Sequence, residues 1–181
     1  MKTRLAASVG DHRALLIYKE LLRHTREIVS QTDYSKYLFY TEEICHNDDW
    51  SKAHFEKRLQ SSGSLGDKIL EAFEHVLASC DRCIIIGSDC PRLSTEHINQ
   101  AFEVLKTKDV VIGPTYDGGY YLLGMNRLES TLFSDIDWST DLVYEQTVNK
   151  VTSKSLTYQS IDKLSDVDYI EDWERWGWDL D

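Results

Sequence analysis

The sequence predicts one α/β domain over residues 1–181, with a mainly parallel, twisted sheet and helices on both of its faces. Short apolar runs alternate with amphipathic helical patterns along the chain, which is the order of elements in such domains. Two of the runs, residues 83–86 and 110–112, lack apolar–polar alternation, so we expect strands buried on both faces. The length suits a single domain with a sizeable core.

The individual elements follow from the same patterns. Leu15, Leu22 and Val29 recur at helical spacing and predict a packing helix that begins at Asp11 or His12. Ser94 can cap the helix that follows the first buried strand. The expected helices cover residues 11–30, 67–78, 94–105, 141–150 and 164–176, and the expected strands cover residues 37–41, 55–60, 83–86, 110–112, 120–123 and, at an edge, 155–158.

Charge and hydropathy restrict the partners. The formal net charge is −11, which argues against nucleic acid and against an anionic membrane surface, although nucleotides need only a few local cations. The sequence contains no apolar run of about 20 residues and no signal-peptide core at its start. The expected compartment is the cytoplasm. The four cysteines, of which Cys80 and Cys83 could form half of a zinc site, are expected to be structural.

Two carboxylates follow two predicted strands. Asp89 lies in a Gly-Ser-Asp turn after residues 83–86, and Asp117 precedes two glycines after residues 110–112. Carboxylates at the carboxyl edge of an α/β sheet lie where such sheets bind ligands, and they suit Mg²⁺ or Mn²⁺ shared with substrate phosphates. The alternative is that Asp89 caps a turn and that Asp-Gly-Gly is only a turn.

Several motifs together resemble one family. They are GSDCPRL at 87–93, GPTYDGGYYLLG at 113–124, DIDWST at 135–140, KTRLA at 2–6, GSLGDKI at 63–69 and LSDVDYIEDW at 164–173. This set resembles DUF2064, called rSAM/selenodomain-associated transferase 1 in some members, within the glycosyltransferase-A-like, nucleotide-diphospho-sugar transferase superfamily. In that family a buried strand and a Pro-Gly turn precede KTRL. Neither is present here, so we expect two unpaired strand edges.

The resemblance implies a transferase that uses a nucleotide-activated donor and a divalent metal. Asp89 would hold the metal, and Asp117 would be a second carboxylate or a base toward the acceptor hydroxyl. The nucleotide would meet the residues of the N-terminus and of the loop before the second helix, where free N–H groups gather. Those residues are Lys2, Arg4, Gln60, Gly63, Leu65, Gly66 and Asp67. A frayed terminus and an ordinary loop capped by Asp67 are the alternatives; the family usually has Asp at position 64 and Glu at position 67.

The acceptor side is expected around the Asp-Gly-Gly turn and the DIDWST motif. Its candidates are Gly118, Gly119, Trp138, Ser139 and Thr140, with a core role as the alternative for Trp138 and capping for the two hydroxyls. Asp166 and Asp168 are expected to cap the last helix, and the resemblance leaves a second metal ligand open there. His46, Asp48 and Asp49 are interpreted as a solvated loop rather than a metal site.

Three functions remain open at this point. The first is glycosyl transfer from a nucleotide-sugar to a small-molecule acceptor. The second is nucleotidyl transfer from an NTP to a phosphorylated acceptor, although the KTRL start differs from the glycine-rich loop usual in such enzymes. The third is a non-catalytic binding or interaction protein. The tryptophan-rich end, if exposed, would suggest a homodimer surface.

Overall fold

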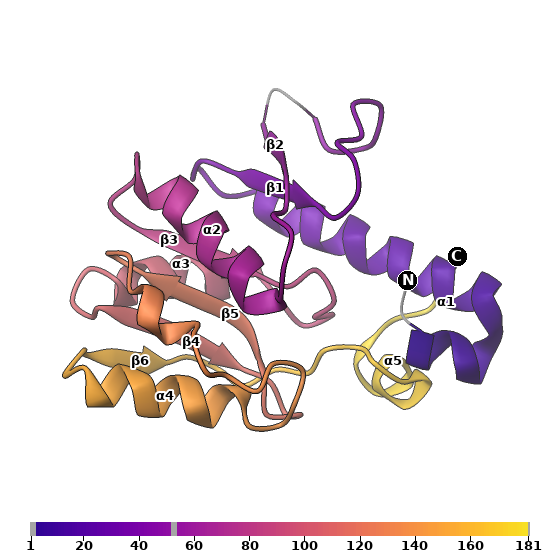
Figure 1. Ribbon diagram of the computed structural model, residues 1–181. Coiled ribbons are helices and arrows are strands. Elements are labelled where there is room, and N and C mark those ends of the chain that lie inside the picture. Colours follow the sequence, from indigo (N-terminus) through magenta and orange to yellow (C-terminus); the bar gives the residue numbers. More distant parts are fainter. Residues whose placement is uncertain (1–2, 52–53, 181) are drawn as a thin grey trace.

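The computed structural model describes residues 3–51 and 54–180, and in these segments helices surround two sheets (Figure 1). The smaller sheet pairs β1 (Tyr37–Tyr40) with β2 (Glu56–Leu59) in parallel. The larger sheet has the order β3-β5-β4-β6. Its strands are β3 (Cys83–Ile86), β4 (Val110–Pro114), β5 (Tyr120–Met125) and β6 (Tyr158–Ser160). The predicted α/β class is confirmed.

Strand direction in the larger sheet is mixed. The strand β5 is antiparallel to both β3 and β4, and β4 is parallel to β6, so β5 alone is reversed. Both strands of the smaller sheet lie at its edges, and β3 and β6 lie at the edges of the larger one. The residues of β1 are all partly exposed, whereas those of β4 are all buried.

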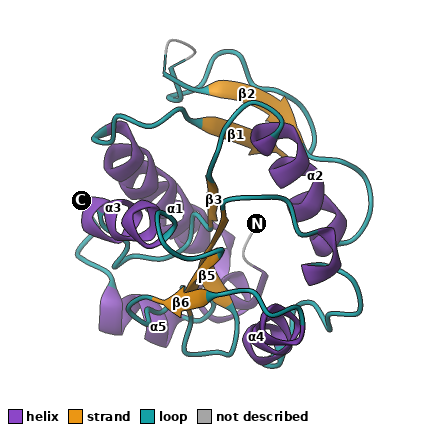
Figure 2. Cartoon of the chain, turned by 90° about the vertical axis from the view of Figure 1, so that its left-hand side faces the viewer, coloured by secondary structure: helices purple, strands orange, loops and turns teal. Residues whose placement is uncertain are grey.

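Helices cover both faces of the larger sheet, as predicted (Figure 2). They are α1 (Thr3–Ser30), α2 (Leu65–Leu77), α3 (Thr95–Val104), α4 (Val143–Ser153) and α5 (Ile170–Trp176), with a short 3₁₀ turn at Ser130–Leu132. Alternation along β4 assigns the faces: Val111 packs with α3 and the end of α1, whereas Val110 and Ile112 pack with α2 and α4.

A third, smaller core lies beside the sheet, where the start of α1 meets α5 (Figure 1). Leu5, Ile17 and Leu21 pack there against Val167 and Trp173, all of them buried. The argument for a dimer from an exposed tryptophan-rich end is therefore wrong for Trp173. A homodimer stays an untested prediction.

Three elements begin three or more residues away from the start that the sequence predicts. The helix α1 begins at Thr3, not at residue 11, and Gly10, with φ 77°, separates its two helical segments. The strand β6 begins at Tyr158, three residues later than predicted. The last helix begins at Ile170, and the carboxylate of Asp172 caps it by accepting the N–H groups of Asp168 and Tyr169. The capping role predicted for Asp166 and Asp168 is therefore wrong.

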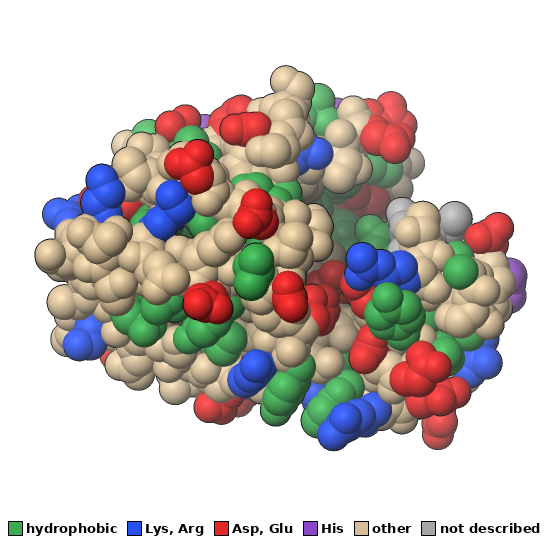
Figure 3. All heavy atoms as spheres, turned by 60° about the horizontal axis from the view of Figure 1, so that its bottom comes forward, with side chains coloured by type: hydrophobic (Ala, Val, Ile, Leu, Met, Phe, Trp, Pro, Cys, Tyr) green, Lys and Arg blue, Asp and Glu red, His purple; other side chains and the backbone are tan. Residues whose placement is uncertain are grey.

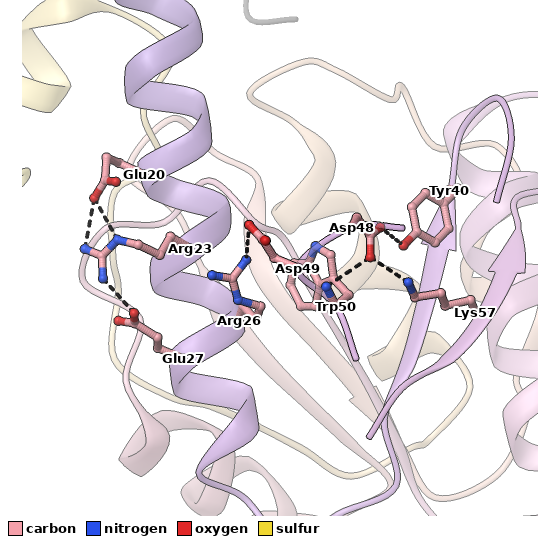
Figure 4. Close-up of polar contacts among 9 residues, drawn as sticks. All are labelled: Glu20, Arg23, Arg26, Glu27, Tyr40, Asp48, Asp49, Trp50 and Lys57. Atoms are coloured by element: carbon pink, nitrogen blue, oxygen red, sulfur yellow. Dashed lines mark hydrogen bonds and ion pairs between the residues drawn. The ribbon is translucent and has the colours of Figure 1, made fainter. Parts of the chain in front are cut away.

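The loop between β1 and β2 is fixed by ion pairs (Figure 4). The ammonium of Lys57, which is only 4% exposed, lies 2.6 Å from Asp48, and the hydroxyl of Tyr40 donates to the same carboxylate. Asp49 instead pairs with Arg26 of α1 at 3.1 Å. The interpretation of this loop as a solvated one is therefore wrong for Asp48, whose side chain is only 21% exposed, and it fits Asp49, which is 82% exposed.

The remaining expectations concern cysteines and membranes. All four cysteines are free, and Cys83 and Cys90 are buried. Burial, together with the negative charge of neighbouring groups, raises the pKa of both thiols to about 12, so they are thiols at neutral pH. Among the described residues, none of the helices combines the length and the apolar character needed to cross a membrane.

Candidate functional site

The loops that carry Asp89 and Asp117 leave the same edge of the larger sheet. Ile86 of β3 and Gly113 of β4 both pair with Leu122 of β5, so these two parallel strands end at the same level with β5 between them. In Figure 3 the surface is hollowed between the body of the molecule and the part that contains α5, and acidic and basic side chains lie along this hollow. The fold thus brings together the two carboxylates that the sequence singles out.

Asp89 is half-buried, and its loop is held from two sides. Its carbonyl oxygen accepts the N–H of Val167 at 3.0 Å, and the Cys90 thiol donates to the carbonyl of Ser165 at 3.2 Å. Its own carboxylate folds back over Gly87, where a Cβ would come within 2.9 Å of Oδ1. Gly87 therefore leaves the space that this carboxylate occupies.

Asp117 is exposed and stabilises its own turn. One carboxylate oxygen accepts the Thr115 hydroxyl and the N–H of Gly119. Gly118 has φ 93°, and a Cβ there would lie 2.1 Å from the carbonyl oxygen of Asp141. Its own carbonyl accepts the N–H of Tyr144 at 2.9 Å. The positive φ and the close approach of Asp141 give Gly118 a structural reason that is independent of any ligand.

The segment before α5 connects the two loops. Leu164 accepts the N–H of Tyr116, and three residues later Val167 donates to Asp89. Asp166 and Asp168 flank Val167, and the negative charge of Asp166 contributes to the raised pKa of the Cys90 thiol. The hydrogen bonds of this segment thus bring further carboxylates to the edge where Asp89 lies.

The predicted N-terminal nucleotide residues are Lys2 and Arg4. Lys2 lies outside the described residues. Arg4 opens α1 and is paired with Asp168 at 2.8 Å, although most of its guanidinium side chain is exposed. The guanidinium also lies 6.0 Å from the centroid of the Tyr169 ring. Arg4 is therefore placed near the Asp89 edge and keeps exposed donors.

The loop before α2 forms a capping box. The Ser64 hydroxyl accepts the N–H of Asp67, and the Asp67 carboxylate accepts the hydroxyl and the N–H of Ser64. The hydrogen bond from the hydroxyl, followed by the one from the N–H, lowers the pKa of Asp67. Gly63, with φ 117°, leaves room for that carboxylate. Upstream, the N–H of Gln60 donates to Tyr40, and the buried hydroxyl of Ser61 has no hydrogen-bond partner among the described residues. A buried hydroxyl without a partner is one that a ligand could satisfy.

Trp138, a predicted acceptor residue, packs against Gly66, a predicted nucleotide-binding residue. A Cβ on Gly66 would come within 2.4 Å of its Nε1, so the indole covers the first turn of α2 beside the exposed Leu65. The same ring meets Tyr120 of β5 edge-on at 6.5 Å. Thr140 accepts the N–H of Leu142 just before α4, and Ser139 is exposed with φ 66°. The helix α4 (Val143–Ser153) has Leu142 as its N-cap and no side-chain cap, so the predicted capping by Ser139 or Thr140 is wrong.

The donor set at this edge suits a hard cation that is shared with a substrate. Among the described residues, no group of three or more His, Cys, Asp or Glu side chains forms a ready-made metal cage. Mg²⁺ is ordinarily held by one or two carboxylates and completed by water and substrate phosphates, so oxygen donors around Asp89 fit that mode and not a closed cage.

Sequence reasoning missed the placement of Tyr116 and Trp176 at this edge, whereas a metal-ligand role near Asp166 was left open by the family resemblance. Tyr116 is 62% exposed although it follows a buried strand, and its ring lies nearly parallel to that of Trp176. Contacts between residues so far apart in the chain leave no local signal. The only hint is the presence of an aromatic residue beside the Asp-Gly-Gly turn.

Comparison with known proteins agrees with this fold. The sequence pattern of DUF2064, described as an uncharacterised protein conserved in bacteria, matches residues 24–140, which leaves the KTRLA and LSDVDYIEDW motifs outside the match. No curated protein matches the chain. A crystal structure of a presumed nucleotide-diphospho-sugar transferase from Desulfovibrio desulfuricans G20 superposes with a TM-score of 0.85 at 26% identity, covering 94% of this chain and 77% of that one.

More distant structures share the fold alone. A 4-diphosphocytidyl-2C-methyl-D-erythritol synthase from Anaerococcus prevotii DSM 20548 has a TM-score of 0.62 at 12% identity and covers 87% of this chain and 84% of its own. Rv0371c from Mycobacterium tuberculosis H37Rv, solved with manganese, has a TM-score of 0.54 at 14% identity over 86% and 84%. The DUF2064 pattern matches more than half of the residues of the present chain, so this chain belongs to the DUF2064 family.

Proposed function

We propose that this protein is a divalent-metal-dependent transferase that moves a glycosyl group from a nucleotide-sugar to a small-molecule acceptor. The observation that carries the proposal is the placement of Asp89 and Asp117 in loops at one edge of the sheet, with β5 between their strands. The likeness to a presumed nucleotide-diphospho-sugar transferase supports the choice of donor.

The donor nucleotide would lie between the α2 loop and Asp89. The buried hydroxyl of Ser61 offers a hydrogen bond to it, and the exposed guanidinium of Arg4 can meet a phosphate as a bidentate fork. Gln60, Gly63, Leu65, Gly66 and Asp67 form the loop and first helical turn beside it. Lys2 would add a second cation.

The divalent ion, Mg²⁺ or Mn²⁺, would be held by Asp89 and donor phosphates and would stabilise the charge on the leaving diphosphate. The structure of Rv0371c with manganese supports this choice. Asp117 is the candidate base because one of its oxygens stabilises the turn while the carboxylate stays exposed. Gly118, Gly119, Trp138, Ser139 and Thr140 would border the acceptor.

Nucleotidyl transfer is the second candidate. It is favoured by the fold shared with the 4-diphosphocytidyl-2C-methyl-D-erythritol synthase. The same edge would then bind an NTP, and the attacking group would be a phosphate of the acceptor. The released product separates the two reactions, because glycosyl transfer releases a nucleoside diphosphate and nucleotidyl transfer releases pyrophosphate.

A thermal-shift and calorimetric screen tests the proposal. The ligands are CTP, UTP, GTP and the UDP-, GDP- and dTDP-sugars, each with Mn²⁺, Mg²⁺ or EDTA. A ligand that binds the native state raises the melting temperature by mass action. We expect a metal-dependent shift with one nucleotide class, which Asp89→Asn abolishes. The matched control is Asp135→Asn, because Asp135 is an exposed aspartate whose φ of 50° asparagine also adopts.

The outcomes separate the candidates. Binding of a nucleotide-sugar that depends on Asp89 supports glycosyl transfer, and binding of an NTP alone supports nucleotidyl transfer. If a cooperatively folded wild-type protein binds none of these ligands, both transferase candidates fail and a non-catalytic role is left.

A further inference from the structure

Two aromatic side chains form an exposed pair beside the Asp117 turn. The rings of Tyr116 and Trp176 lie 6.4 Å apart between centroids and within 9° of parallel. Tyr116 is among the most exposed large apolar residues of the described chain, and Trp176 is partly exposed. An aromatic surface of this kind binds the flat face of another ring by stacking.

A cationic side chain lies over each of the two rings. The ammonium of Lys163 lies 5.0 Å from the centroid of Tyr116, and the guanidinium of Arg175 lies 4.8 Å from that of Trp176. Neither cation has a carboxylate partner among the ion pairs of the described residues. In a protein with a net charge of −11, these two cations over neighbouring rings are available to meet an anion.

The pair is fixed next to the proposed reaction centre. The N–H of Tyr116 donates to Leu164 at 3.1 Å, and Asp117 is the next residue in the chain. The helix α5, which carries Trp176 and Arg175, is anchored through Trp173 in the third core. The rings are therefore held by two separate elements that meet at the edge of the sheet.

We propose that Tyr116, Trp176, Lys163 and Arg175 form an acceptor subsite that binds a ring bearing an anionic group, such as a sugar phosphate or an aryl phosphate. The ring stacks on the aromatic pair, and the anion lies between the two cations. This subsite rests on the proposed transferase function, because it places the acceptor beside Asp117. It names the class of acceptor, which the carboxylates alone leave open.

Titration by ligand-observed NMR or calorimetry tests the subsite on the full chain without nucleotide. The probes are phenyl phosphate and glucose 1-phosphate, with glucose and inorganic phosphate as the ring-only and anion-only comparisons. We expect the two ring phosphates to bind more tightly than either comparison. Tyr116→Ala and Lys163→Met should each weaken binding about tenfold, whereas Tyr116→Phe, which keeps the ring, should not.

The controls separate binding from folding. Lys106→Met removes an exposed lysine that is paired with Glu103 on the surface, and it should leave probe binding unchanged. Melting temperatures report whether Tyr116→Ala still folds, and its metal-dependent nucleotide binding should match the wild type. Equal binding of inorganic phosphate and the ring phosphates, or a Tyr116→Ala protein that binds the probes normally, would overturn the subsite.

Failure of the two proposals gives different results. A wild-type protein that binds nucleotide but not the ring phosphates refutes the subsite and leaves the transferase proposal standing. A protein that binds the ring phosphates through Tyr116 but no nucleotide refutes the transferase proposal alone.

Discussion

The neighbouring aspartates Asp48 and Asp49 differ in role because they differ in burial and in the residues that pair with them. Burial opposes ionisation of Asp48, but hydrogen bonds from Lys57, Tyr40 and the Trp50 N–H outweigh it and lower the pKa of Asp48. Asp49 is 82% exposed and makes a surface pair with Arg26 (Figure 4). The sequence presents both as loop acids, and only the fold distinguishes them.

Removing Asp48 should be far more costly than removing Asp49. Asp48→Ala leaves the nearly buried ammonium of Lys57 without its carboxylate, so we expect the free energy of unfolding to fall by about 3 kcal/mol. Asp49→Ala breaks only an exposed pair and should change it by less than about 0.5 kcal/mol. Urea denaturation at neutral pH measures both, and equal losses would contradict the assignment.

The pH dependence of stability follows from the same group. A carboxyl whose pKa is lowered by folding stabilises the native state above its unfolded pKa of about 4 and loses that contribution as the pH falls further. We therefore expect the wild type to lose stability more steeply than Asp48→Ala as the pH falls below about 4. Parallel stability curves for the two proteins would refute a role for Asp48 in this loss.

Gly87 offers a test of where the carboxylate of Asp89 has to lie. Its φ is one that alanine adopts, so Gly87→Ala should cost less than about 1 kcal/mol, but the added Cβ must push Asp89 Oδ1 away. We expect metal-dependent nucleotide affinity to fall about tenfold or more, because displaced ligands bind metal poorly. Unchanged affinity would mean that the bound carboxylate points away from Gly87.

At the scale of whole elements, local patterns found most of the fold and missed what distant contacts decide. The boundaries of β1 and β3 were predictable because short apolar runs end in turn residues. The first segment of α1 was missed because its buried Leu5 packs with Val167 and Trp173, which lie at the other end of the chain. The start of β6 is set by its pairing with β4 from Tyr158 onward, after Ser155 has turned with φ 57°.

The residues of the candidate site likewise divide into those that local sequence patterns predict and those that only distant contacts place there. Asp89 and Asp117 were found because each directly follows a predicted strand. Asp166 lies between two residues that bond to the Asp89 loop, Ser165 through the Cys90 thiol and Val167 through Asp89, and no periodicity in the sequence indicates these contacts. The Tyr116–Trp176 pair likewise joins two elements whose relative position only the folded chain defines.

The helix α2 gives an element-scale prediction. Its first turn is closed by the capping box of Ser64 and Asp67, so Ser64→Ala should reduce the free energy of unfolding by about 1 kcal/mol. Ser62→Ala, in the same exposed loop but outside the box, is the control and should be neutral. Urea denaturation distinguishes them, and a neutral Ser64→Ala would show that the cap contributes nothing to stability.

At the scale of the whole molecule, burial divides the chain into a central core and less protected surroundings. The strands β4 and β5 lie inside the larger sheet, with cores on both faces, and are almost entirely buried. The strands β1 and β2 form a separate pair whose residues are partly or fully exposed. Unequal burial predicts unequal local stability, because segments with few buried contacts open more readily.

Hydrogen exchange measured by mass spectrometry tests this division. The amides of β4 and β5 should exchange only through global unfolding, whereas those of β1 and β2 should exchange through local opening at lower free energy. A nucleotide that lies between the α2 loop and Asp89 would contact the loop after β2 of the smaller sheet and the loop after β3 of the larger sheet. Its binding with Mn²⁺ should therefore slow amide exchange in residues 60–67 and in residues 87–91 together. Slowing at only one of these loops would contradict a donor that spans them, and equal protection of all strands without ligand would contradict the division itself.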